Sequence, residues 1–122
     1  MLITELPAVG QPLESGIFAG ITSTVEGHFA VVLLADKPGG DLTWKKAINW
    51  AEKLGATLPS RPVAAMLLAN LKAQFEPSWY WTNESFDSSF AWYQYFITGD
   101  QYYCSKSAEL RARAVRLIQL TA

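Results

Sequence analysis

Two β-prone, largely apolar runs lie in the first part of the chain, and in the middle apolar residues recur with a helical period. Residues 17–25 and 28–35 are rich in β-prone and apolar side chains on either side of a Glu-Gly turn signal, which predicts a β-hairpin. Between residues 44 and 54, apolar side chains recur every three or four positions. With Thr43 as N-cap and Gly55 just beyond the end, this pattern predicts an amphipathic helix.

A second helix is expected to begin after Ser60, its predicted N-cap, and to end near Glu76, because Pro77 disfavours helical backbone in the residue before it. A β-like pattern then returns. The predicted strands are 79–82, 90–98, 101–104 and 111–120, and 83–89 is a predicted polar loop. Strands, two helices and strands in this order predict an antiparallel α+β domain and argue against βαβ winding.

Length and composition predict one folded domain. Residues 1–16 hold two prolines and two glycines and are interpreted as an irregular N-terminal arm, and residues 17–122 as a single domain. Half of the 122 residues are hydrophobic and 17% are charged, a balance that excludes intrinsic disorder. A chain of this size buries roughly two-thirds of its unfolded surface, which is enough for an independent core.

The charge balance excludes a general nucleic-acid binder, since ten basic and eleven acidic side chains leave a net charge of −1. No membrane association is expected, because the longest apolar run, 29–35, is far too short to span a bilayer. The N-terminus lacks the basic start of a signal peptide. Cys104 is the single cysteine, which excludes an internal disulfide and favours a reducing, cytoplasmic compartment.

Several motifs in order resemble the DUF1566 family, which includes the C-terminal domain of the Legionella collagen-like adhesin and small phage and prophage proteins. The motifs are Trp44…Trp50-Ala51…Leu54-Gly55, Leu58-Pro-Ser-Arg61, Trp79-Tyr-Trp-Thr82, Ala91-Trp92…Phe96…Gly99 and Arg111-Ala-Arg-Ala-Val-Arg116. The resemblance covers roughly residues 40–118. It implies a C-type-lectin-like fold of the formylglycine-generating-enzyme type, with two helices packed on a twisted antiparallel sheet with long loops. It also implies a phage or prophage protein in a bacterial host cell or a virion.

Catalysis is not expected from the titratable residues. The catalytic branch of that wider fold needs a reactive cysteine pair, and this chain has only Cys104. His28 has no second histidine or nearby carboxylates to form a catalytic or metal site. The loop carboxylates at positions 84, 87 and 100 are too sparse for calcium. The resemblance implies that Arg113 has a structural role, in which a buried carboxylate or backbone carbonyls hold its guanidinium. We therefore expect no enzyme, no cofactor and no metal.

Aromatic side chains are concentrated between residues 79 and 103. The resemblance implies that Trp92, Phe96 and Phe90 point inward, which leaves the tyrosines of the alternate register for a binding face. Tyr supplies a rigid, amphipathic contact at low entropic cost. The alternative is that this second face is also covered and interior. The predicted contact residues are Asn83, Glu84, Phe86, Asp87, Tyr93, Tyr95, Asp100, Gln101, Tyr102 and Tyr103.

The leading hypothesis is therefore a non-catalytic binding module that recognises a host or virion protein, for example as an inhibitor of a host defence factor. A carbohydrate-binding lectin-like module and a receptor-binding part of a phage particle are the alternatives. Self-association through the tyrosine-rich face also remains open.

Overall fold

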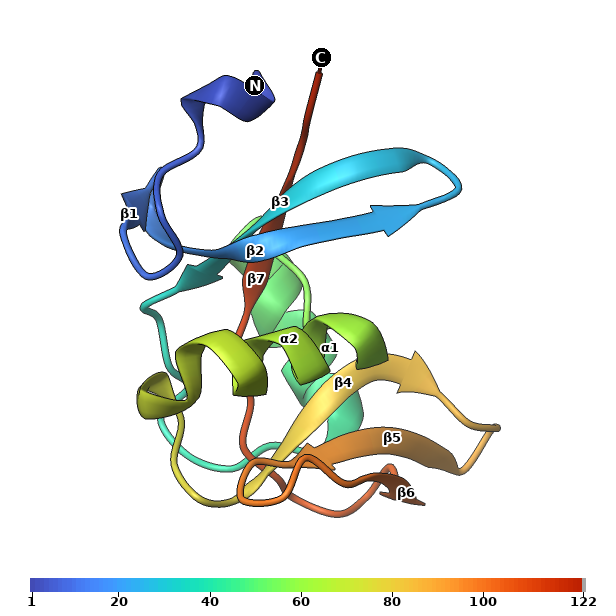
Figure 1. The fold of residues 1–122 in the computed structure, drawn as a ribbon. Helices are drawn as coiled ribbons and strands as arrows, with labels where there is room; N and C mark the ends of the chain where they lie inside the picture. Colours follow the sequence, from blue (N-terminus) through green and yellow to red (C-terminus); the bar gives the residue numbers. More distant parts are fainter. Residues whose placement is uncertain (122) are drawn as a thin grey trace.

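The computed structural model describes residues 1–121. These residues form two α-helices and seven strands, and the strands make up two antiparallel sheets (Figure 1). Position 122, the last residue of the predicted domain, lies outside the described residues. In chain order the elements are η1 (Ile3–Glu5), β1 (Pro12–Leu13), β2 (Gly16–Thr24), β3 (Gly27–Leu34), α1 (Trp44–Lys53), α2 (Arg61–Leu71), η2 (Lys72–Gln74), β4 (Trp79–Ser85), β5 (Phe90–Tyr95), β6 (Gln101–Ser105) and β7 (Val115–Gln119). The predicted α+β class is confirmed.

The first sheet has the strand order β1-β2-β3-β7 and joins the two ends of the chain. Its centre is the predicted β2–β3 hairpin, which is confirmed, and β7 pairs antiparallel with β3. The segment predicted as an irregular arm is anchored to this sheet, because Pro12 pairs with Ile17 and the Ile3 N–H donates to the Thr121 carbonyl. Both termini consequently lie together at the top of Figure 1.

The helix starts follow local sequence chemistry. α1 begins after Thr43, which holds the N-cap position without a side-chain capping bond, and ends at Lys53, with Gly55 in the left-handed conformation (φ +67°), as predicted. The Ser60 hydroxyl accepts the Val63 N–H and caps α2. No helix in the described part of the chain is long and apolar enough to cross a lipid bilayer.

The predicted end of α2 near Glu76 is wrong. The α-helix stops at Leu71 and continues only as the short turn η2. Phe75 then takes an extended conformation, which lets its ring stack on Phe96 at 4.2 Å and meet Tyr80 edge-on at 5.2 Å. The chain is thus already extended at Phe75, two residues before Pro77, and its ring is held by these aromatic contacts.

Three strand boundaries also differ from the prediction. β4 continues through Ser85, so the predicted polar loop begins at residue 86, and β5 ends at Tyr95. β7 begins at Val115, while residues 111–114 are not part of a strand. Arg111 instead bridges to β4, where the Trp81 N–H donates to its carbonyl and its own N–H donates to the Trp79 carbonyl.

The core consists of two main apolar clusters that meet at β3. Val31 and Leu33 pack with α2, Tyr80 and Phe96, whereas Val32 and Leu34 pack with α1 and Trp81. Residues 30–34 of β3 are buried on both faces, and this part of the strand is continuously apolar. α2 contacts β2 of the first sheet and both β4 and β5 of the second, and it crosses between the two sheets in Figure 1. This leaves the rest of the second sheet available for a site.

Candidate functional site

The second sheet, with the order β4-β5-β6, carries most of the predicted contact residues on its two faces. On one face Gln94 pairs with Gln101 and Trp92 pairs with Tyr103. α2 covers the Gln94 end of this face, where the Gln94 Nε2 donates to the Ala64 carbonyl at 2.7 Å. The part of this face that α2 does not cover, around Trp92 and Tyr103, is open, and aromatic side chains lie there.

We call these side chains the aromatic patch: Phe86, Phe90, Trp92 and Tyr103, together with Tyr102, which has the opposite register on β6 but whose ring lies 4.5 Å from the Tyr103 ring. The Phe86 ring lies parallel to the Tyr103 ring at 3.9 Å, and Trp92 meets the Tyr103 ring edge-on at 5.3 Å. Phe86, Phe90 and Tyr102 are 47%, 37% and 57% exposed. The rings are therefore fixed against one another and still accessible from solvent.

Arg61, the first residue of α2, anchors the patch. Its guanidinium carbon lies 3.6 Å from the Trp92 ring centroid, and its Nε donates to the Gln101 Oε1 at 2.9 Å. Gln101 in turn donates through Nε2 to the Arg61 carbonyl and to the buried Gln94 Oε1. This chain of contacts fixes the position of Trp92 relative to the helix.

An open groove of about 700 Å³ lies on the other side of Arg61. Glu84, Asp100 and Gln101 line it, so the structure brings together three of the predicted polar contact residues. The Glu84 Oε2 accepts the Arg61 backbone N–H at 2.8 Å. A carboxylate at a helix N-terminus is electrostatically favourable, so Glu84 also stabilises α2.

The remaining predicted contact residues lie elsewhere. Asn83 is exposed near the end of β4, and the Asp87 Oδ1 accepts the backbone N–H groups of Ser89 and Phe90, which holds the β4–β5 turn. Tyr95 stacks on the exposed Trp79 at 4.9 Å, away from the patch. Tyr93 is half-buried against the core cluster that contains Trp81, and this burial raises its pKa.

The two faces of β5 are covered differently from the expectation. The expectation that Phe90 points inward is wrong, because α2 does not reach this end of the sheet and the side chain is 37% exposed. Phe96 is buried, as expected, whereas Trp92 is half-buried and faces the aromatic patch. The opposite face, with Tyr93, packs against Ala108 and Leu110 of the segment after β6. That second face is therefore largely interior, and the open aromatic surface belongs to the Trp92 face.

His28 and Cys104, the residues considered for catalysis in the sequence, lie in surroundings that give them no catalytic partner within the described residues. His28 is exposed, with its Nδ1 2.6 Å from the Ser23 Oγ. Burial raises the pKa of the Cys104 thiol, which disfavours the thiolate that a nucleophile needs. Among residues 1–121, no three His, Cys, Asp or Glu side chains lie close enough together to hold a metal ion.

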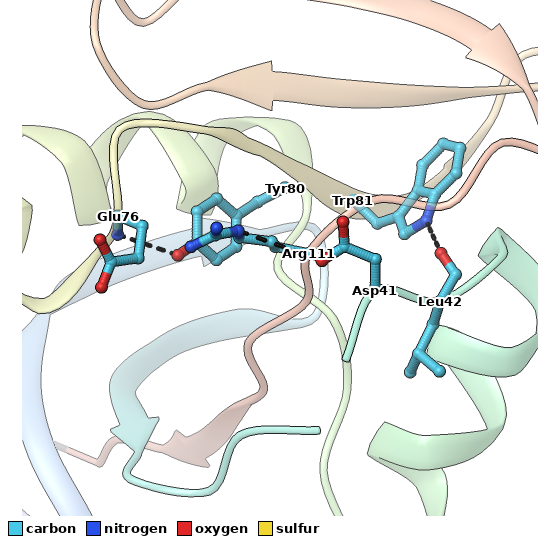
Figure 2. Close-up of polar contacts among 6 residues, drawn as sticks. All are labelled: Asp41, Leu42, Glu76, Tyr80, Trp81 and Arg111. Atoms are coloured by element: carbon cyan, nitrogen blue, oxygen red, sulfur yellow. Dashed lines mark hydrogen bonds and ion pairs between the residues drawn. The ribbon is translucent and has the colours of Figure 1, made fainter. Parts of the chain in front are cut away.

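A cleft of about 400 Å³ lies between the loop at residues 37–41 and the segment at 73–76. Figure 2 shows part of its wall, where Arg111 and Asp41 face each other at 4.0 Å and Tyr80 accepts the Glu76 N–H. Nearby, the Trp81 indole donates to the Leu42 carbonyl. Acidic and basic groups alternate along this wall, so it has no strong preference for either sign of charge.

Arg113 also lines this cleft, but its guanidinium serves the fold. Its Nη1 donates to the Gln74 carbonyl at 2.6 Å and its Nη2 to the Leu34 carbonyl at 2.8 Å. It is thus held by backbone carbonyls, one of the two arrangements that the resemblance implied. Burial lowers its pKa, since desolvation disfavours the charged form.

Sequence reasoning did not assign Arg61, Trp92 or Phe90 to the site. One signal for Arg61 was present: a cation at the first position of a helix opposes the helix dipole, so it needs a compensating partner elsewhere. No local signal distinguishes Trp92 from the other aromatic residues of β5, because aromatic side chains occupy both registers of that strand.

Comparisons with known proteins add no assignment. No protein-family model matches the chain, and no curated protein matches it significantly.

Proposed function

We propose that this chain is a non-catalytic binding module that recognises a protein partner through the aromatic patch and the adjoining groove. The observation that carries this proposal is the exposure of Phe86, Phe90 and Tyr102 around the parallel Phe86–Tyr103 pair. Aromatic residues and Arg are the types enriched at the energetic centres of protein interfaces. Arg61 lies directly beneath this surface, against Trp92.

The stacking makes the patch suited to binding because its rings are already ordered. An interface normally loses affinity when flexible side chains are immobilised, at about 0.5–1.5 kcal/mol each. Phe86 and Tyr103 are restrained by their mutual contact, and Trp92 by Arg61. Covering the exposed part of each outer ring contributes on the order of 1 kcal/mol, since complete burial of a Phe is worth roughly 1.5–3 kcal/mol.

The groove provides polar complementarity beside this apolar surface. Asp100 is exposed there, and Gln101 and Glu84 are partly accessible. Rim groups of this kind fix the orientation of a partner more than they add affinity. The resemblance to small phage proteins favours a bacterial host protein or a virion protein as the partner. A host defence factor met in the cytoplasm is one such candidate.

The test is affinity capture from host lysate with the wild type and a Phe86→Ala/Tyr102→Ala variant. Trp79→Ala is the matched control, because Trp79 is also an exposed aromatic (46%) of the second sheet but lies outside the patch. Circular dichroism establishes that each variant folds. Specific capture by the wild type and Trp79→Ala, with loss in the double variant, supports the proposal. Equal capture by all three proteins places the interface elsewhere and refutes it.

A second candidate function is glycan binding, favoured by Trp79. Its exposed indole lies nearly parallel to the Tyr95 ring at 4.9 Å, so a rigid flat surface is available for stacking against a sugar ring. A glycan array distinguishes the two functions. Binding that is lost in Trp79→Ala and retained in Phe86→Ala/Tyr102→Ala would favour the carbohydrate role, whereas an array without signal would remove it.

A further inference from the structure

The outer edge of β6 is an unpaired strand edge. In the β5–β6 ladder the Tyr95 N–H donates to the Asp100 carbonyl and the Lys106 N–H donates to the Ser89 carbonyl. Because antiparallel ladder bonds alternate along a strand, Tyr102 and Cys104 also bond toward β5. The backbone groups of Gln101, Tyr103 and Ser105 therefore point away from the sheet. Within residues 1–121, the N–H groups of Gln101 and Tyr103 and their carbonyls have no partner on that side, whereas the Ser105 carbonyl already accepts the Ala108 N–H at 3.0 Å and has one lone pair left for a further donor.

The other outer strands are covered or short. Thr57 bonds the edge of β7 at Val115, and Met1 and Ile3 bond its far end. Arg111 and Pro59 bond the edge of β4, and β1 is a two-residue strand that begins with proline. β6, with the sequence Gln-Tyr-Tyr-Cys-Ser, contains no proline or lysine. Natural proteins normally protect edge strands with such features, so an unprotected edge is suited to pairing.

We propose that a second copy of this chain occupies the edge, through antiparallel pairing of β6 with β6 about Tyr103. A two-fold axis at Tyr103 places Gln101 opposite Ser105 of the other copy. The same register sets Asp100 opposite Lys106 of the other copy at both ends of the strand. The sequence is therefore complementary in charge to itself, and opposite charges facing each other across antiparallel strands are stabilising.

The surroundings of the edge are compatible with this pairing. Asp100 and Ser105 are exposed, and Tyr102 is 57% exposed. The Lys106 Nζ donates to the Asp87 carbonyl at 2.6 Å and keeps further donor hydrogens for a carboxylate. Figure 1 shows β6 at the lower margin of the molecule. We expect a reversible dimer, because β6 is only five residues long.

Pairing would join the two three-stranded sheets into one continuous sheet. Since the two-fold axis is perpendicular to the sheet, both copies of Tyr103 lie on the same face, beside Phe86 of each copy. The two aromatic patches become neighbours on one surface. This inference concerns assembly and does not depend on the identity, or the existence, of a separate partner.

The test is sedimentation velocity over a wide concentration series with the wild type, Ser105→Pro and Ser105→Ala. Proline removes the outward N–H of Ser105 and is tolerated at an edge where that N–H faces solvent. Alanine removes the hydroxyl and keeps the N–H. A wild type and an alanine variant that dimerise with concentration, beside a proline variant that remains monomeric, support the proposal.

A charge exchange tests the register and covers the case in which Ser105→Pro does not fold. Asp100→Lys places like charges opposite Lys106 and is expected to raise the dimer dissociation constant several-fold, whereas Asp100→Lys/Lys106→Asp restores opposite charges and recovers much of the association. A monomeric wild type at every concentration overturns the proposal, whatever the capture experiment finds. A dimer unaffected by Ser105→Pro and by Asp100→Lys also overturns it, because the contact then lies elsewhere.

Discussion

Replacing Arg61 by alanine tests the arrangement that holds the aromatic patch. The wild-type side chain is partly buried, with its guanidinium against Trp92 and its Nε bonded to Gln101. At a partly exposed site the cation–π contact is worth about 0.5–1 kcal/mol. The hydrogen bond to Gln101 contributes about 1 kcal/mol. Both contributions are lost in Arg61→Ala.

An opposing effect reduces this loss. Arg61 is the first residue of α2, where the helix dipole disfavours a positive charge by about 0.3–1 kcal/mol. Removing the cation relieves this repulsion and leaves the Glu84 bond to the backbone N–H intact. The lost contacts exceed the relief, so we expect Arg61→Ala to lower the free energy of unfolding by about 1 kcal/mol.

Urea unfolding followed by tryptophan fluorescence measures this difference, and Arg61→Lys is the matched control. Lysine keeps the unfavourable charge at the helix start but lacks the planar group that stacks on Trp92 and bonds Gln101. We therefore expect Arg61→Lys to be at least as destabilised as Arg61→Ala. An alanine variant more stable than the wild type would show that the dipole term dominates. Full stability in the lysine variant would show that charge alone suffices.

Three further predictions concern the fold that supports the site. Trp81→Phe should lower the free energy of unfolding in urea by about 2–3 kcal/mol, because it removes the bond to the Leu42 carbonyl and leaves a cavity in the core. Gly99→Ala should lower the melting temperature, since a left-handed conformation (φ +86°) costs a non-glycine residue about 1–2 kcal/mol and the new methyl would lie 2.8 Å from Leu68. For Cys104 the folded-state pKa is raised, so its contribution to stability is complete below the unfolded pKa of about 8.5 and is lost as pH rises through the folded pKa. Alkylation of the native protein should accordingly show a midpoint above pH 8.5, and a midpoint at or below that value would contradict burial of the thiol.

The elements that were predicted correctly depend on local chemistry. The start of α2 follows from the Ser60 cap and the end of α1 from Gly55, because a capping residue acts on groups within one helical turn. Thr43 occupies the N-cap position of α1 as predicted, but its side chain makes no capping hydrogen bond. The β2–β3 hairpin follows in the same way from the Glu-Gly turn signal between two β-prone runs. The end of α2 was missed: the α-helix stops at Leu71, and beyond η2 the chain extends at Phe75, whose ring packs on Phe96 and Tyr80.

The aromatic density between residues 79 and 103 was visible in the sequence, but the face it occupies was not. β5 has aromatic side chains in both registers, so a period of two cannot distinguish its faces. The position of α2 makes that distinction. It buries Gln94, a polar residue that the alternation alone would not place in the core, and leaves Trp92 at the boundary of the covered region.

Arg61 shows where a sequence contains more information about a site than its periodicity does. Ser60 and Pro62 are favourable residues at a helix start, whereas an arginine between them is unfavourable. A residue that conflicts with its local preference must be compensated by contacts from outside the element. Here those contacts are Trp92, Gln101 and Glu84, which are the residues that join the patch to the groove. The unfavourable arginine at the first position of α2 therefore marks the point at which the start of this helix and the second sheet form a common surface.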